Sequence, residues 1–86
     1  MAVVFIPTLL LPLTGGLKQI QAAGTTLRQV ITDVDRQFPG VGERVMDSAG
    51  IRPEILLAIG ADEAFSIDEA VGPDTEVHIL PAIAGG

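Results

Sequence analysis

The sequence predicts an α+β domain in which one helix covers one face of a mixed sheet of four to five strands. Three observations lead to this fold class. An apolar stripe of helical period occupies residues 27–38, short apolar runs of strand type lie on both sides of it, and proline and glycine separate the runs. The length of 86 residues is that of one domain.

The segment before the helix is expected to form two strands joined as a hairpin. Residues 2–6 are rich in β-branched and aromatic side chains, which is typical of a short buried strand. Residues 9–11 lie between two prolines and are interpreted as an irregular connection. A turn signal at residues 14–16 then leads into a second strand over residues 17–22.

The helix has the strongest periodic signal in the chain. Five apolar residues recur with helical spacing on one face: Leu27, Val30, Ile31, Val34 and Phe38. Thr26 and Gln29 have the spacing of a capping box, so Thr26 is the expected N-cap. Pro39 and Gly40 end the helix.

The second half of the chain is expected to supply the remaining strands. A short helical turn over residues 41–47 and a loop over residues 48–53 precede a strand over residues 54–59. The predicted order then continues with a turn at 60–63, a very short strand at 65–67, a turn at 72–74 and a last strand at 75–80. Pro81 ends that strand.

Composition excludes several classes of function. Five basic residues against eleven acidic ones give a net charge of −6, which disfavours nucleic-acid binding and favours a basic partner surface. The absence of cysteine excludes disulfides and thiol nucleophiles. The apolar start of the chain lacks a basic flank and is too short for a membrane helix, so the expected location is the cytoplasm.

No group of residues has the spacing of a catalytic or metal site. Asp33 and Asp35 are two apart on a helix and do not face each other. His78 has no companion that indicates a triad and is interpreted as a strand-surface residue. The glycines at 15–16 and 40–42 match no phosphate-binding motif. We therefore expect no metal, no bound cofactor and no catalytic residue.

Strand alternation predicts an apolar patch on the face of the sheet that the helix leaves open. If Val77 and Ile79 face the helix, Leu80 lies on the open face. The strand before it adds Leu56 and Ala58, and the first strand, apolar on both sides, adds Phe5. Exposed apolar patches mark interaction sites. The alternative is that residues 9–13 fold over this face and turn it into core.

The order of elements, together with the ending Leu80-Pro81-Ala82-Ile83-Ala84-Gly85-Gly86, resembles the ubiquitin-like sulfur carriers of bacteria and archaea. These are β-grasp proteins of the molybdopterin-synthase small-subunit and thiamin sulfur-carrier type. Residues 6–8, residues 14–16 and the Leu80-Pro81-Ala82 ending are most similar to the molybdopterin-type carriers and the carriers for cysteine synthesis.

The resemblance implies a β-grasp domain over residues 1–81 and a flexible diglycine tail over residues 82–86. It implies that an E1-like enzyme uses ATP to adenylate the Gly86 carboxylate. A persulfide donor then supplies sulfur, and the resulting thiocarboxylate serves an acceptor synthase subunit or a cysteine synthase. On this hypothesis the chain is a co-substrate, either a free carrier or the small subunit of a synthase, and not an enzyme.

The tail residues suit that chemistry. Glycine has no Cβ, so Gly85 and Gly86 allow a narrow approach into a partner's active site. The remaining expected recognition residues of the tail are Pro81, Ala82, Ile83 and Ala84. Two alternatives stay open: a modifier that is joined through Gly86 to lysines of target proteins, and an interaction subunit that binds through the apolar patch and does not need Gly86.

Overall fold

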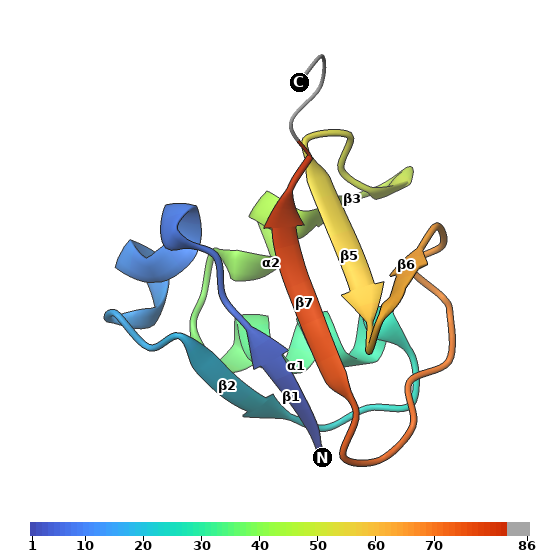
Figure 1. The fold of residues 1–86 in the computed structure, drawn as a ribbon. Helices are drawn as coiled ribbons and strands as arrows, with labels where there is room; N and C mark the ends of the chain where they lie inside the picture. The colour runs from blue at the N-terminus through green and yellow to red at the C-terminus, as the bar shows by residue number, and fades with distance from the viewer. Residues whose placement is uncertain (83–86) are drawn as a thin grey trace.

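The structure, a computed structural model, describes residues 1–82 and contains a five-stranded mixed sheet with both α-helices on one face (Figure 1). The strands are β1 (Ala2–Phe5), β2 (Gln19–Ala22), β5 (Ile55–Ile59), β6 (Asp62–Ala64) and β7 (Glu76–Pro81), in the spatial order β2-β1-β7-β5-β6. β1 runs parallel to β7, and the other pairs are antiparallel. The predicted α+β class is confirmed.

Helix α1 (Leu27–Gln37) forms as the apolar stripe predicts. Leu27, Val30, Ile31 and Val34 are buried, and Phe38 packs against the same core from the C-cap. Thr26 is the N-cap, because its hydroxyl accepts a hydrogen bond from the Gln29 N–H at 3.2 Å. In a capping box the Gln29 side chain would accept a hydrogen bond from the N–H of Thr26. Here it accepts from the N–H of the preceding residue, Thr25, at 2.8 Å.

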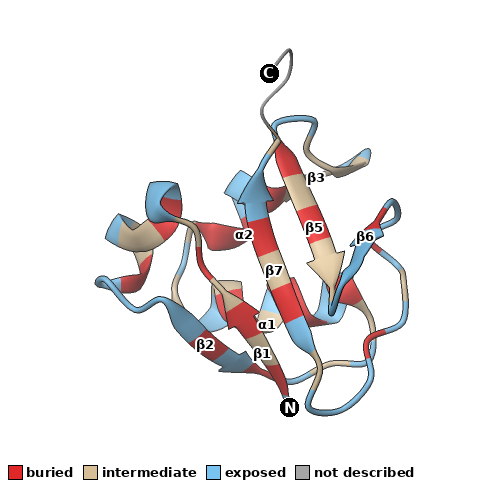
Figure 2. Cartoon of the chain, viewed as in Figure 1, coloured by how far each residue is buried: buried red, intermediate tan, exposed pale blue. Residues whose placement is uncertain are grey.

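The core lies between the sheet and the helices. In β1, β5 and β7 buried side chains alternate with half-buried or exposed ones, as the banding of Figure 2 shows. The buried helix-facing members of the three strands are Ala2, Val4, Ile55, Leu57, Val77 and Ile79, and Ile59 packs half-buried against the same core. The sequence predicted this orientation for β5 and β7, and that prediction is confirmed.

The connection between β1 and β2 is more regular than expected. Residues Thr8–Thr14 form the 3-10 helix η1, where the sequence predicted an irregular segment. Leu10 of η1 is fully buried, and the Thr14 hydroxyl donates to the Leu17 carbonyl at 2.8 Å. β2 consequently begins at Gln19 and not at Leu17.

The predicted loop at 48–53 contains a small hairpin instead. Helix α2 (Val41–Val45) leads into β3 (Met46–Asp47), which pairs with β4 (Gly50–Ile51). The Asp47 carboxylate accepts from the Ala49 N–H at 2.8 Å and so stabilises the turn. Strands of two residues have too little pattern for sequence reasoning to find.

The predicted strand at 65–67 is wrong, and β6 occupies residues Asp62–Ala64. The turn predicted over 60–63 is shorter, because Ile59 and Asp62 already pair. Gly60 allows this with a φ of 61°, a left-handed conformation that glycine adopts at little cost. Asp62 and Glu63 therefore lie on an edge strand, where charged side chains oppose pairing with other chains.

No helix within residues 1–82 has the length and apolar character needed to span a membrane.

Candidate functional site

The open face of the sheet is organised in rows that cross the strands. One row runs through all five strands of the main sheet: Gln19, Phe5, His78, Ala58 and Glu63. Leu56 and Leu80 pair in the row nearer the end of β7, and Gln21, Val3 and Glu76 form the row on the other side. The face is therefore apolar toward the end of β7 and polar toward its start.

The four predicted patch residues lie together on this face. Leu80 is 44% exposed, and Phe5, Leu56 and Ala58 are half-buried. Residues 8–14 lie beside the sheet and do not cover the patch (Figure 1). Their apolar side chains pack instead against the helix-side core through Leu10, Leu11 and Leu13. The alternative in which residues 9–13 close this face is therefore wrong.

His78 lies at the centre of the open face. Its ring stacks on Phe5 with a centroid distance of 4.4 Å and an interplanar angle of 8°. Its Nε2 lies 3.1 Å from Glu76 Oε1. The sequence placed His78 on a strand surface, which is correct. The stacking of His78 on Phe5 could not be predicted from the sequence, because it depends on the parallel pairing of β1 with β7.

The last described residues fix the point where the chain leaves the sheet. Pro81 pairs with Ile55, and the Ala82 N–H donates to the Glu54 carbonyl at 2.9 Å. The tail residues predicted for recognition and activation, Ile83, Ala84, Gly85 and Gly86, lie outside the described residues. Leu80 and Leu56 are thus the open-face residues next to the exit point.

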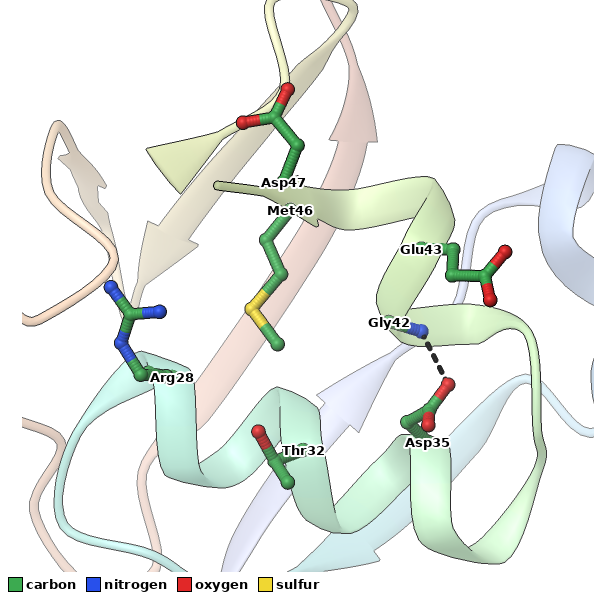
Figure 3. A pocket seen from close by; sticks show the side chains of 7 residues that line it. All are labelled: Arg28, Thr32, Asp35, Gly42, Glu43, Met46 and Asp47. Carbon is green, nitrogen blue, oxygen red and sulfur yellow. Dashed lines mark hydrogen bonds between the residues drawn. The ribbon is translucent and has the colours of Figure 1, made fainter. Parts of the chain in front are cut away.

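The acidic residues of α1 have structural partners. Asp35 accepts from the Gly40 and Gly42 N–H groups at 3.0 and 2.9 Å. Gly42 is buried against Asp35, and a Cβ at this position would lie 3.1 Å from Asp35 Oδ1. The close approach of α2 to α1 (Figure 3) explains this glycine by packing. Within residues 1–82 no three potential metal ligands gather, and Asp33 and Asp35 form no pair.

Asp33 connects α1 to the end of β2. It accepts from the Ala23 N–H at 3.0 Å and from the Arg36 guanidinium at 2.7 Å. The backbone hydrogen bond from Ala23, followed by that from Arg36, lowers the pKa of the Asp33 carboxyl below its ordinary value. The hydrogen bond from Arg28 likewise lowers the pKa of Asp68.

Asp33→Ala is expected to reduce the free energy of unfolding by roughly 1 kcal/mol at pH 7, because charged hydrogen bonds are lost. The pKa of this carboxyl is lower in the folded than in the unfolded chain. Its contribution is therefore present above the unfolded pKa of about 4 and is lost as pH falls through the folded pKa. Urea denaturation at pH 7 and pH 3 should show the difference between wild type and variant shrinking. An unchanged difference at both values would contradict this role.

The fold places the chain in the β-grasp class of ubiquitin-like proteins. It superimposes on a crystal structure of CysO from Mycobacterium tuberculosis with a TM-score of 0.89, 31% identity, and coverage of 96% of this chain and 100% of that one. The CysO in a BexX/CysO complex of Amycolatopsis orientalis matches with a TM-score of 0.92 and 29% identity over the whole of both chains. Small archaeal modifier protein 1 of Haloferax volcanii, at 17% identity and a TM-score of 0.74, shares the fold.

The chain belongs to the family of CysO sulfur carrier proteins. It is 42% identical to the sulfur carrier protein CysO of Mycobacterium tuberculosis, in an alignment that covers 96% of each chain, and equally similar to that of Mycobacterium bovis. No protein-family model matches the chain. The resemblance inferred from its element order and ending is thereby confirmed.

Proposed function

We propose that this sulfur carrier works through the carboxylate of Gly86. An E1-like enzyme binds the carrier and ATP, and the carboxylate attacks the α-phosphate to give an acyl-adenylate. Pyrophosphate leaves in this step. The outer sulfur of a persulfide donor then displaces AMP and gives an acyl disulfide, and a thiol of the donor or the activating enzyme reduces it, which releases the thiocarboxylate on Gly86 and forms a disulfide. Adenylation is needed because a carboxylate is a poor electrophile, whereas the adenylate has a good leaving group.

The observation that carries this proposal is the position of the apolar patch relative to the tail. Leu56 and Leu80 form the row of the open face nearest to Ala82, where the described chain leaves the sheet. A partner that covers these residues holds the carrier next to the point from which the tail extends. Residues 83–86 span at most about 13–14 Å when extended. The activating centre would thus lie within about that distance of Ala82.

The polarity of the open face supports one orientation of the docked enzyme. The apolar residues Phe5, Leu56, Ala58 and Leu80 lie in the middle row and in the row nearer the end of β7, whereas Gln21 and Glu76 occupy the far row. Burial of apolar surface is favourable, and burial of a carboxylate without a partner is costly. The enzyme would therefore cover the half of the face near the tail and leave Glu76 at the rim.

The carrier itself would act as a co-substrate. Its role is to present the tail. ATP is bound by the activating enzyme, and the carrier would bind no cofactor of its own.

As acceptor we propose an enzyme of cysteine synthesis, since the curated relatives are CysO carriers and the sequence resembles carriers for that route. A partner protein is present in the complex of the Amycolatopsis CysO with BexX. A cytoplasmic location stays a prediction.

Carrier-dependent exchange of pyrophosphate into ATP by the cognate E1-like enzyme tests the first step. The full chain is expected to support exchange without any sulfur donor, because adenylation precedes sulfur transfer. The same reaction followed by incubation with a lysate separates the alternatives. Conjugates to lysines would favour the modifier, and the absence of exchange with retained binding would favour a pure interaction subunit.

A further inference from the structure

His78 is the one side chain of this protein whose type changes charge between about pH 5.5 and 7. The sequence contains a single histidine and no cysteine. Carboxylates ordinarily titrate at about pH 4, and lysine and arginine titrate above about pH 10. The α-amino group of Met1 lies 3.7 Å from Asp74, at the end of the sheet where β1 and β7 begin. A carrier-side response of the tail-proximal face to mild acid therefore depends on His78.

His78 lies in the middle row of the open face, between Phe5 of β1 and Ala58 of β5. Its side chain is 30% exposed. Strands β1, β2 and β5 contain no charged residue. The carboxylates of this face belong to Glu76 on β7 itself and to Glu63 on β6, across Ala58. Within residues 1–82 only Glu76 comes within ion-pair distance of the ring.

The contact with Glu76 determines which nitrogen of the neutral His78 ring carries the proton. An ionised carboxylate only accepts hydrogen bonds, so Nε2, 3.1 Å from Glu76 Oε1, must be the donor. Nδ1 is then a bare acceptor, and it forms no hydrogen bond with any residue of the described part of the chain. Protonation places a hydrogen on Nδ1 and turns it into a charged donor without an acceptor on the carrier.

We propose that the activating enzyme docks on the carrier with His78 in its neutral form, so that mild acid weakens their association. This dependence rests on the proposed function, because it requires an enzyme that covers the face beside the tail. Phe5 belongs to the apolar residues that the enzyme would cover, and the His78 ring stacks on it at 4.4 Å. Covering a bare acceptor costs less free energy than covering a charged donor that has no partner.

The ordinary titration of histidine sets the size of the effect. If the enzyme binds only the neutral form, the apparent affinity falls in proportion to the neutral fraction. For a histidine that titrates at about pH 6.5, this fraction falls from about three quarters at pH 7 to about a tenth at pH 5.5. Glu76 stays at the rim and stabilises the charged ring in part, so we expect a weakening of about threefold to tenfold.

Isothermal titration calorimetry of the full chain with its cognate E1-like enzyme at pH 7 and pH 5.5 tests this dependence, with circular dichroism to verify the fold. Two variants remove the titrating group. His78→Phe keeps an aromatic ring for the stack on Phe5, and His78→Gln keeps a neutral donor beside Glu76. Wild type should bind about threefold to tenfold more weakly at pH 5.5, whereas each variant should bind equally at both pH values.

Proton release gives a second readout. At about pH 6 wild-type binding should release part of a proton, so its enthalpy should differ between phosphate and Bis-Tris buffers. An equal wild-type affinity at both pH values, or the same weakening in both variants, would overturn the role of His78. Pyrophosphate exchange at pH 7 separates the two proposals. Exchange that persists with a pH-independent affinity overturns only the role of His78, whereas the absence of both exchange and association overturns both.

Discussion

Removal of Gly86 is expected to lower the rate of adenylation by at least about 10²-fold, with no change in thermal stability. The shortened chain still ends in a glycine carboxylate, that of Gly85, so the reacting group is chemically the same. It is displaced by one residue, about 3.5 Å, from its place relative to Ala82. A misplacement of about 1 Å can cost 10²-fold in a positioned reaction. Pyrophosphate exchange with the cognate E1-like enzyme measures the effect.

Two further variants separate length from chemistry. Insertion of one alanine between Ile83 and Ala84 in the shortened chain restores the length with one terminal glycine, and should recover part of the rate. Gly86→Ala keeps the length and adds a Cβ beside the reacting carbon. Its rate of adenylation is expected to be lower, because the wider tail fits less well into a narrow active site. Full activity of the shortened chain would show that adenylation does not depend on the distance between Ala82 and the terminal carboxylate.

Leu80→Glu is expected to weaken association with the activating enzyme by about 10²-fold while the domain stays folded. Leu80 is 44% exposed and pairs with Leu56 on the open face, so the charge costs little in the isolated carrier. In the complex the new carboxylate would be buried without a partner, which costs several kcal/mol. Isothermal titration calorimetry measures the loss, and circular dichroism verifies the fold.

Gln21→Glu is the matched control for this charge. Gln21 is exposed on the same face of the sheet, two strands away in the polar row. It should change the affinity by less than about threefold, as expected for a charge at the rim. Equal effects of the two substitutions would contradict docking at the tail-proximal end. Unfolding by Leu80→Glu would show that Leu80 contributes to the core.

Local periodicity explains which parts of the fold could be predicted from the sequence. The stripe from Leu27 to Phe38 and the alternation in β5 and β7 determine which side chains are buried, and both predictions are confirmed. The apolar patch followed from them, because one helix cannot cover both faces of a sheet. These features depend on residues close together in the chain.

The features that were missed depend on contacts between elements and not on the pattern within one element. β6 forms because Asp62 pairs with Ile59 across a two-residue turn. Its acidic sequence does not indicate a strand. The Phe5–His78 stack requires the parallel register of β1 and β7. The packing of Gly42 against Asp35 requires the approach of α2 to α1. No period in the sequence reports any of these contacts.

The most direct test of the account is the intact mass of the full chain after incubation with its E1-like enzyme, ATP, a persulfide donor and a thiol reductant. We predict a mass increase equal to the exchange of one oxygen for one sulfur, confined by fragmentation to Gly86 and absent when ATP is omitted. An unchanged mass, under conditions in which the same enzyme and donor convert a CysO relative, would contradict the proposal that this carrier holds sulfur on Gly86.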